Sequence, residues 1–471
     1  MVRPSRQPRV ALLVAGILIG VGLGIGAAAP TAASHPSAFS RPLIIPRVLT
    51  GSNITLTAAA TDVQILPGAK TRMWTYNGLF PGPTIRRPAG QTTTVTLVNK
   101  LPIAAGELTL HNHGNHSTSE NDGQPDAFLA APAGGSVTYT YTGTEAGGNE
   151  RGAFQWYHDH RMDVTGRNVW MGLAGMYIID DPADPQTLPK GEFDVPLLIA
   201  DRSFNAKNQL AYRFDAAGVT GNHILVNGVP QPYFKVGDRK YRLRILNASN
   251  SRSYDLALSN GQSFIQIGTE SGLLPAPVRR TRILIGPAER VEVVVDFAKR
   301  LNQKIVLQNL AATGSLRQLM QFRVTRDLTD NSSVPTKLRP LPPLDPTSAV
   351  TRTFEFSRER FGGRWTINGM VFDPNRVDAQ PNLDTTETWI LKNKSSTNHV
   401  IHIHDVDQQL MSRNGVAPAP YELMKESWNI SRGQTVAVKL KFTGHVGRYV
   451  FHCHILEHED AGMMAQFEVV P

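Results

Sequence analysis

Alternating hydrophobic and polar positions recur along most of the chain beyond residue 45. The stretches TVTLV at 94–98 and YRLRI at 241–245 are two examples. A period of two residues is typical of β-strands that bury one face. Long stretches with the 3.6-residue period of a helix are almost missing beyond the N-terminal segment. The pattern therefore predicts an all-β protein.

A motif that occurs three times divides the chain into domains. Each copy has an Asn-Gly pair, a turn, an alternating strand and an asparagine at the strand end, and the pairs lie 150 and 141 residues apart. The pairs begin at Asn77, Asn227 and Asn368, and the strand-end residues are Asn99, Asn247 and Asn393. This spacing predicts three β-sandwich domains with Greek-key connections, at 45–185, 190–327 and 345–471.

The segment 1–34 has the pattern of an export signal. Three arginines precede a long apolar run, and small residues follow it in PTAAS. The run also has the roughly 20 residues that span a bilayer, so an uncleaved N-terminal anchor with membrane association is the alternative. We expect an exported protein that is secreted, periplasmic or bound to the cell envelope.

Charge and cysteine content narrow the function further. The formal net charge is +9, but no dense run of Lys and Arg occurs, which favours an ordinary basic surface over nucleic-acid binding. With Cys453 as the only cysteine, no disulfide can form within the chain. The fold must be stabilised by core packing.

Histidine placement gives the strongest functional pattern. Of the 14 histidines, ten fall in four clusters, two in the first repeat and two in the third. So many buried imidazoles in a purely structural role would each need a polar partner, so we predict metal binding. The clustered residues are His111, His113, His158, His160, His399, His402, His404, His452, His454 and His458. We expect His35, His116, His223 and His445 to lie at the surface or to form local hydrogen bonds.

Strand parity sorts the C-terminal ligands into two sites. Side chains alternate faces along a strand, so Cys453 points away from His452 and His454. If the two C-terminal clusters are strands of one sheet, one face carries His399 and Cys453, followed by His458 and Met463. The other face carries His402, His404, His452 and His454.

The ligand types favour copper on both faces. A thiolate, two imidazoles and a distant thioether form the trigonal site typical of blue copper, whereas zinc prefers a closed tetrahedral set of cysteines and histidines. The four imidazoles of the other face, with four from the first domain, suit a cluster of about three copper ions bridged by oxygen species. One peptide link joins Cys453 to each neighbouring histidine.

The motifs HNHG, WYHDH, HVIHIH and HCHILEHEDAGMM resemble the four copper motifs of the multicopper oxidases, in the same order. Further stretches such as FIQIGTESGLLP resemble the bacterial spore-coat laccase and bilirubin oxidase group. The resemblance implies three cupredoxin domains and four coppers per chain. It also implies oxidation of a donor coupled to the four-electron reduction of O₂ to water.

The resemblance also implies residue roles. Type 1 copper would be bound by His399, Cys453, His458 and Met463, type 2 by His111 and His402, and the two type 3 coppers by His113, His158 and His454 and by His160, His404 and His452. Asp122 and Glu459 align with acids that supply protons for O₂ reduction. Their alternatives are an ordinary turn residue and a hydrogen-bonding spacer.

The sequence predicts the electron donor less directly than it predicts the copper ligands. No methionine-rich tract occurs, which disfavours Cu(I) oxidation by that route, and the short segment between His404 and Cys453 predicts an open type 1 edge. We expect small aromatic reductants, phenols or aromatic amines, as in laccases. A ferrous, cuprous or manganous oxidase is the alternative, and a blue-copper electron carrier or copper-sequestering protein is the alternative from another class.

Overall fold

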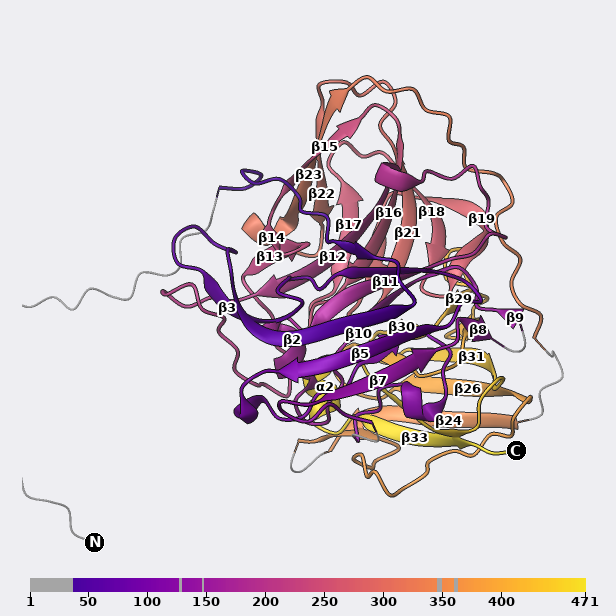
Figure 1. Cartoon of the computed structure of the whole chain (residues 1–471). Coiled ribbons are helices and arrows are strands. Elements are labelled where there is room, and N and C mark those ends of the chain that lie inside the picture. The colour runs from indigo at the N-terminus through magenta and orange to yellow at the C-terminus, as the bar shows by residue number, and fades with distance from the viewer. Residues whose placement is uncertain (1–36, 127–128, 146–147, 345–349, 360–362) are drawn as a thin grey trace, which may run out of the picture.

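The computed structural model of the chain describes residues 37–126, 129–145, 148–344, 350–359 and 363–471. It confirms the all-β prediction: strands dominate, and the two described α-helices are short, α1 (Thr165–Met171) and α2 (Leu456–Asp460) (Figure 1). Four 3₁₀ turns are η1 (Ile103–Ala105), η2 (Ser119–Asn121), η3 (Gly191–Phe193) and η4 (Gly314–Arg317). The predicted export signal at 1–34 lies outside these residues, and no helix within them is long and apolar enough to cross a membrane.

Domain 1 packs a five-stranded sheet, β1-β4-β11-β10-β6, against a four-stranded sheet, β3-β2-β5-β7, and a two-stranded sheet, β8-β9, lies beside them. Its core includes Leu56, Val95, Leu97 and Tyr177. The strands are β1 (Val48–Leu49), β2 (Asn53–Val63), β3 (Thr71–Tyr76), β4 (Thr84–Pro88), β5 (Thr93–Lys100), β6 (His111–His113), β7 (Ser136–Tyr141), β8 (Thr144–Glu145), β9 (Gly148–Asn149), β10 (Ala153–His158) and β11 (Ala174–Asp180).

Domain 2 has a seven-stranded sheet, β14-β13-β12-β16-β21-β18-β19, over a five-stranded sheet, β15-β23-β22-β17-β20. Leu197, Leu243, Val293 and Phe322 lie in the core between them. The strands are β12 (Asp194–Arg202), β13 (His223–Val226), β14 (Val229–Pro230), β15 (Tyr233–Gly237), β16 (Lys240–Asn247), β17 (Tyr254–Leu258), β18 (Phe264–Thr269), β19 (Gly272–Arg280), β20 (Ile283–Ile285), β21 (Arg290–Asp296), β22 (Lys304–Asn309) and β23 (Gln318–Arg326).

Domain 3 has a six-stranded sheet, β25-β24-β26-β31-β28-β29, and a four-stranded sheet, β30-β27-β32-β33. Its core contains Trp389, Trp428 and Phe451 and also Cys453 and Met463. The strands are β24 (Val350–Arg358), β25 (Trp365–Ile367), β26 (Thr386–Asn393), β27 (His399–Ile403), β28 (Gln408–Arg413), β29 (Met424–Lys425), β30 (Ser427–Ile430), β31 (Thr435–Lys441), β32 (Gly447–Cys453) and β33 (Met464–Val469).

The three Asn-Gly pairs form the same turn in all three domains. Asn77, Asn227 and Asn368 have φ of 54°, 48° and 52°, and the glycine after each also has positive φ, as type I′ turns require. Each asparagine side chain accepts a hydrogen bond from a neighbouring strand, at Thr57, Leu198 and Glu355 respectively. The repeated motif therefore has a repeated structural role.

Helix α2 joins the three domains directly after β32, the strand that carries His452 and Cys453. The Asp460 carboxylate accepts hydrogen bonds of 2.9 Å from the backbone N–H groups of Thr165 and Gly166, at the start of α1 in domain 1. The Glu457 carboxylate accepts bonds from Asn250 and from the backbone of Val219 in domain 2. These contacts fix the position of β32 relative to both other domains.

Candidate metal centre

The register of β27 and β32 separates two groups of predicted ligands. The strands are antiparallel, with Ile401 opposite Cys453 and His402 opposite His452. Residues directly opposite each other point to the same face of a sheet. Cys453 therefore points into the core of domain 3, while His402 and His452 share the other face.

The Cys453 face brings together one thiol and two imidazoles. The Sγ atom of Cys453 lies 3.4 Å from His399 Nδ1 and 3.6 Å from His458 Nδ1, and these two nitrogens are 3.1 Å apart. Met463 is fully buried in the same core, and its backbone N–H and carbonyl bond to His458 and Cys453. Burial raises the pKa of the Cys453 thiol to about 12, so a bound cation is needed to stabilise the thiolate.

The type 1 edge is covered, so the prediction of an open edge is wrong. His458 is 1% exposed, and the Trp365 ring lies over it with the ring centroids 4.1 Å apart. The Trp365 indole N–H donates to the Ala216 carbonyl at 2.5 Å. The cover over His458 comes from β25 of domain 3 and from the domain 2 loop at Ala216.

The other face forms one end of a larger histidine cluster. The Nε2 atoms of His160, His404 and His452 lie 3.1 to 3.3 Å from one another, although His160 comes from domain 1 and the other two from domain 3. Three converging imidazole nitrogens at this spacing are an arrangement that one metal ion can occupy.

The remaining five imidazoles complete the cluster between domains 1 and 3. The rings of His113 and His402 stack at 3.7 Å, and His454 lies 5.0 Å from His113 and 5.4 Å from His158. His111 joins the cluster through its ring contact of 4.0 Å with His404. All eight imidazoles that sequence parity and resemblance assigned to one site are thus within one buried cluster.

The imidazole nitrogens that have no hydrogen-bond partner show whether these residues fit copper. The Nδ1 atoms of His111, His158 and His402 contact backbone carbonyl oxygens at 2.6, 2.9 and 3.0 Å. The Nε2 atoms of the same residues, and of His113 and His454, are buried without a hydrogen-bond partner. The pKa values of His113, His158, His402 and His454 are lowered by burial, which favours the neutral imidazole that binds a metal. For His111, the charge of Asp122 outweighs burial and raises the pKa. The donor set fits copper.

Asp122 and Glu459, the two predicted acids, both lie at this cluster. Asp122 Oδ2 is 2.7 Å from His404 Nδ1, and the two Glu459 oxygens are 3.2 and 3.0 Å from the Nδ1 atoms of His160 and His452. Although burial raises the pKa of each carboxyl, these imidazoles and, for Asp122, also His111 hold both well below their usual range. Asp122 therefore accepts a hydrogen bond from His404 Nδ1, while Glu459 lies at ion-pair distance from His160 and His452.

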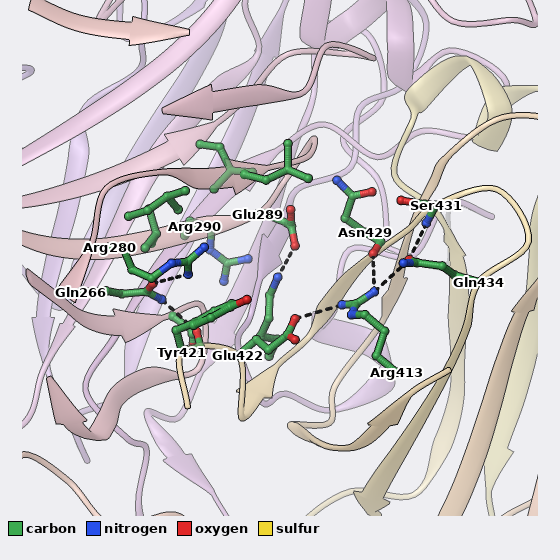
Figure 2. A pocket seen from close by; sticks show the side chains of 16 residues that line it. Gln266, Arg280, Glu289, Arg290, Arg413, Tyr421, Glu422, Asn429, Ser431 and Gln434 are labelled. Carbon is green, nitrogen blue, oxygen red and sulfur yellow. Dashed lines mark hydrogen bonds and ion pairs between the residues drawn. The ribbon is translucent and has the colours of Figure 1, made fainter. Parts of the chain in front are cut away.

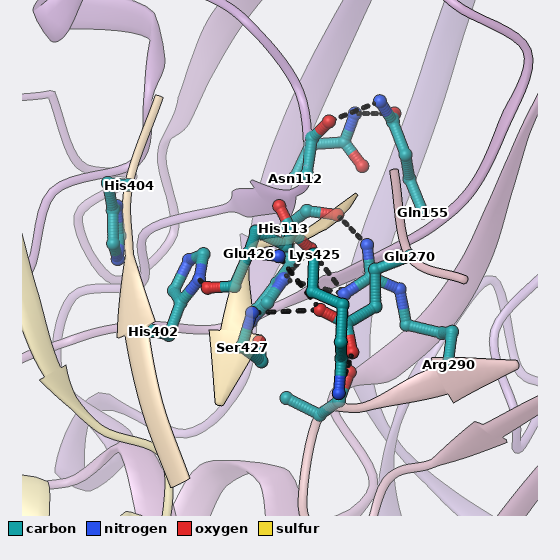
Figure 3. A network of polar contacts seen from close by, with 12 residues as sticks. Asn112, His113, Gln155, Glu270, Arg290, His402, His404, Lys425, Glu426 and Ser427 are labelled. Atoms are coloured by element: carbon teal, nitrogen blue, oxygen red, sulfur yellow. Dashed lines mark hydrogen bonds and ion pairs between the residues drawn. The ribbon is translucent and has the colours of Figure 1, made fainter. Parts of the chain in front are cut away.

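Domain 2 supports the cluster through residues that the sequence did not reveal. Glu426 Oε1 lies 2.7 Å from His113 Nδ1 and also pairs with Arg290 of domain 2 (Figure 3). Glu270 of domain 2 accepts the backbone N–H groups of Glu426 and Ser427 at 3.0 and 2.8 Å. Burial raises the pKa of Glu270 to about 7. A carboxylate on the free nitrogen of a ligating histidine fixes its orientation.

A pocket of about 260 Å³ between domains 2 and 3 borders the support of the cluster, since Arg290, which pairs with Glu426, lines it. None of its lining residues is a predicted copper ligand. Its wall contains the ion pair of Arg413 with Glu422 (Figure 2) and that of Lys425 with Glu289. We do not assign it a role in the reaction.

Comparison with known proteins identifies the family. Two family models, both described as multicopper oxidase, match residues 57–184 and 340–471. The chain is 34% identical to a laccase of Bacillus stratosphericus, over 85% of this chain and 91% of that protein. The chain belongs to the multicopper oxidases. It is also 36% identical to a bilirubin oxidase of Albifimbria verrucaria, over 83% of this chain and 72% of that protein. The crystal structure of a multi-copper oxidase from Pediococcus acidilactici matches with a TM-score of 0.83 and 34% identity, over 94% of both chains.

Membership implies four coppers, which supply one-electron oxidation of a donor and the reduction of O₂. The chain's own residues connect the two sites: one peptide bond joins Cys453 to His452 and another joins it to His454. Trp365 and the backbone around Ala216 exclude water from His458. Asp122 and Glu426 accept hydrogen bonds from the Nδ1 atoms of His404 and His113, which directs the Nε2 atoms of these imidazoles into the cluster. Glu459 places its charge 3.0 to 3.2 Å from the Nδ1 atoms of His160 and His452.

Proposed function

We propose that this multicopper oxidase is an exported laccase-type enzyme that oxidises phenols and aromatic amines. Electrons enter through His458 and Cys453, and O₂ is reduced at the eight-histidine cluster. The similarity to laccases over most of the chain supports the substrate class. The segment 1–34 is the basis of the proposed export.

The groups around His458 favour an aromatic donor over a metal ion. Among the described residues, the only group of possible metal-binding side chains that contains His458 is the type 1 set itself. A metal-ion oxidase needs ligands that hold the ion beside the entry point. Here an indole ring covers His458, with the exposed guanidinium of Arg358 5.0 Å from the ring centroid. This edge suits contact with an aromatic molecule.

Asp122 and Glu459 are the proposed proton relays. Reduction of O₂ to water consumes four protons, and the cluster is buried, so protons must reach it through side chains or ordered water. Each carboxylate contacts imidazoles of the cluster, and ionised carboxylates can accept protons for transfer.

The test is O₂ uptake by the copper-loaded protein with methoxyphenols, aromatic amines, Fe(II), Cu(I) and Mn(II) as donors. We expect several aromatic donors to be oxidised, in the order of their reduction potentials, with no metal ion exceeding them in kcat/KM. A metal ion preferred over every aromatic donor would overturn the laccase-type proposal and favour a metal-ion oxidase. Blue protein without O₂ uptake on any donor would instead favour an electron carrier.

A further inference from the structure

Outside the copper sites, His116, Glu145, Glu150 and Asp407 form a second group of ionisable side chains, which we call the junction cluster. His116 comes three residues after His113, and Asp407 three residues after His404. Glu145 ends β8, and Glu150 follows β9. The junction cluster therefore joins domain 1 to domain 3 beside two copper-binding segments. His116 is 8% exposed, so the surface alternative of its prediction is wrong.

The two nitrogens of His116 face different carboxylates. One donor atom each from His116, Glu145 and Asp407 lies within 4.8 Å of the others, and His116 Nε2 is 3.7 Å from Glu145 Oε1. On the opposite side, His116 Nδ1 is 3.5 Å from Glu150 Oε1, which Gln155 fixes with a hydrogen bond of 2.7 Å. Nε2 thus lies nearest Glu145 and Nδ1 nearest Glu150, with Asp407 completing the group on the Glu145 side.

Two buried atoms of the cluster have no hydrogen-bond partner. They are His116 Nδ1 and Glu150 Oε2, and the Glu150 side chain is only 2% exposed. Burying unsatisfied polar groups is costly, and native structures rarely leave them so. A small movement of the imidazole toward Glu150 would pair Nδ1–H with that carboxylate and leave the Nε2 lone pair directed at Glu145 and Asp407.

The cluster holds three carboxyl groups and one imidazole. Among the described residues, no Lys or Arg forms an ion pair with Glu145, Glu150 or Asp407. The nearby Arg151 donates instead to the backbone carbonyls of Leu273 and Pro340. Burial, together with the charge of Glu145, raises the pKa of Asp407 to about 7. Despite burial, Glu145 and Glu150 also raise the pKa of His116, so a metal ion bound among these groups would replace protons that they hold.

We propose that His116, Glu145 and Asp407 bind one divalent transition-metal ion, additional to the four coppers, through His116 Nε2 and an oxygen of each carboxylate. One imidazole and two carboxylates are a donor set that Zn²⁺ and similar ions accept. Glu150 acts as the positioning residue, since a carboxylate on the other nitrogen commonly orients a ligating histidine. The ion stabilises the junction of domains 1 and 3.

Zinc is the probe that tests this site, because it is redox-silent and the copper sites are filled beforehand. The copper-loaded protein is equilibrated with Zn²⁺ and the metals per chain are counted, with the affinity taken from calorimetry. We expect one zinc per chain beyond the four coppers. Asp407→Asn and Glu145→Gln should each weaken zinc binding at least about tenfold. Copper content should stay unchanged in both.

A control variant and thermal unfolding distinguish loss of the zinc site from a general loss of folding. Glu192→Gln removes an exposed carboxylate elsewhere, ion-paired with Arg326, and should bind zinc as the wild type does. Zinc should raise the thermal unfolding midpoint of the wild type but not of Asp407→Asn.

The proposal is overturned if the wild type takes up no zinc beyond its copper, or if Asp407→Asn binds zinc equally well. Loss of copper together with zinc in both variants would also overturn it. Glu145, in the small β8-β9 sheet, supplies the second variant if Asp407→Asn fails to fold.

Discussion

The two faces of β32 differ in the groups that surround them. On the Cys453 face, no described carboxylate forms a hydrogen bond or ion pair with the thiol or with its two partner imidazoles, and Trp365 covers the edge. On the other face, Asp122, Glu426 and Glu459 all contact imidazoles of the cluster. Transfer of single electrons needs no proton donor, whereas the reduction of O₂ to water does. The carboxylates therefore lie on the face where O₂ reduction consumes protons, and not on the face where single electrons enter.

The two faces also differ in how they are assembled. The type 1 set comes entirely from domain 3, from residues 399–463. The eight-histidine cluster takes ligands from domains 1 and 3, and domain 2 supports it through Arg290 and Glu270. Disturbing one face should therefore leave the other largely intact, and the predictions below test that independence.

Removing the thiol has the largest expected effect. Cys453→Ser should abolish the visible blue absorption and reduce donor oxidation to background, because the charge transfer and the electron entry both depend on the thiolate. The other copper sites should retain much of their metal. The measurements are the visible spectrum, the copper content and O₂ uptake. Undiminished turnover would contradict electron entry at Cys453.

Neutralising the carboxylates should have an intermediate effect confined to the other face. Asp122→Asn and Glu459→Gln should each lower the rate of O₂ reduction by about 10²-fold, the lower end of the usual contribution of general acid–base catalysis. The blue absorption and the rate of its bleaching by a donor should not change. Glu120→Gln, an exposed neighbour of Asp122, is the control. Normal O₂ reduction in both variants would return the two acids to a structural role.

Changing the axial thioether should have the smallest effect. Met463→Leu should raise the type 1 reduction potential on the order of 60 mV, a tenfold change in a one-electron equilibrium, while copper is retained. Met464→Leu is the matched control, since both residues are buried and adjacent. Redox titration measures the potential. Equal potentials in all three proteins would show that Met463 only packs in the core.

The sequence predicted well what depends on short-range geometry. Cys453 and His452 lie on opposite faces because strand side chains alternate, and the register of β27 and β32 shows that arrangement. The Asn-Gly turns were equally readable, because few residues other than asparagine and glycine adopt positive φ easily.

Contacts between distant segments were not predictable from the sequence. Glu426 and Arg290 have no motif, and their role arises only when domain 2 packs against the cluster. The cover over His458 was missed for the same reason: Trp365 and the loop at Ala216 lie far from it in the chain. Similarly, nothing near His116 in the sequence points to Asp407, which comes from another domain.

The central claim is that electrons enter on the Cys453 face and leave on the histidine face of the same strand. Its most direct test is a stopped-flow experiment on the copper-loaded wild type and on His160→Ala. Both proteins are reduced with ascorbate without O₂ and then mixed with O₂, while the blue absorption is followed. We predict equal bleaching during reduction in the two proteins. After mixing, the absorption should return rapidly in the wild type and fail to return in His160→Ala on that time scale. Equal rates of return would contradict the claim.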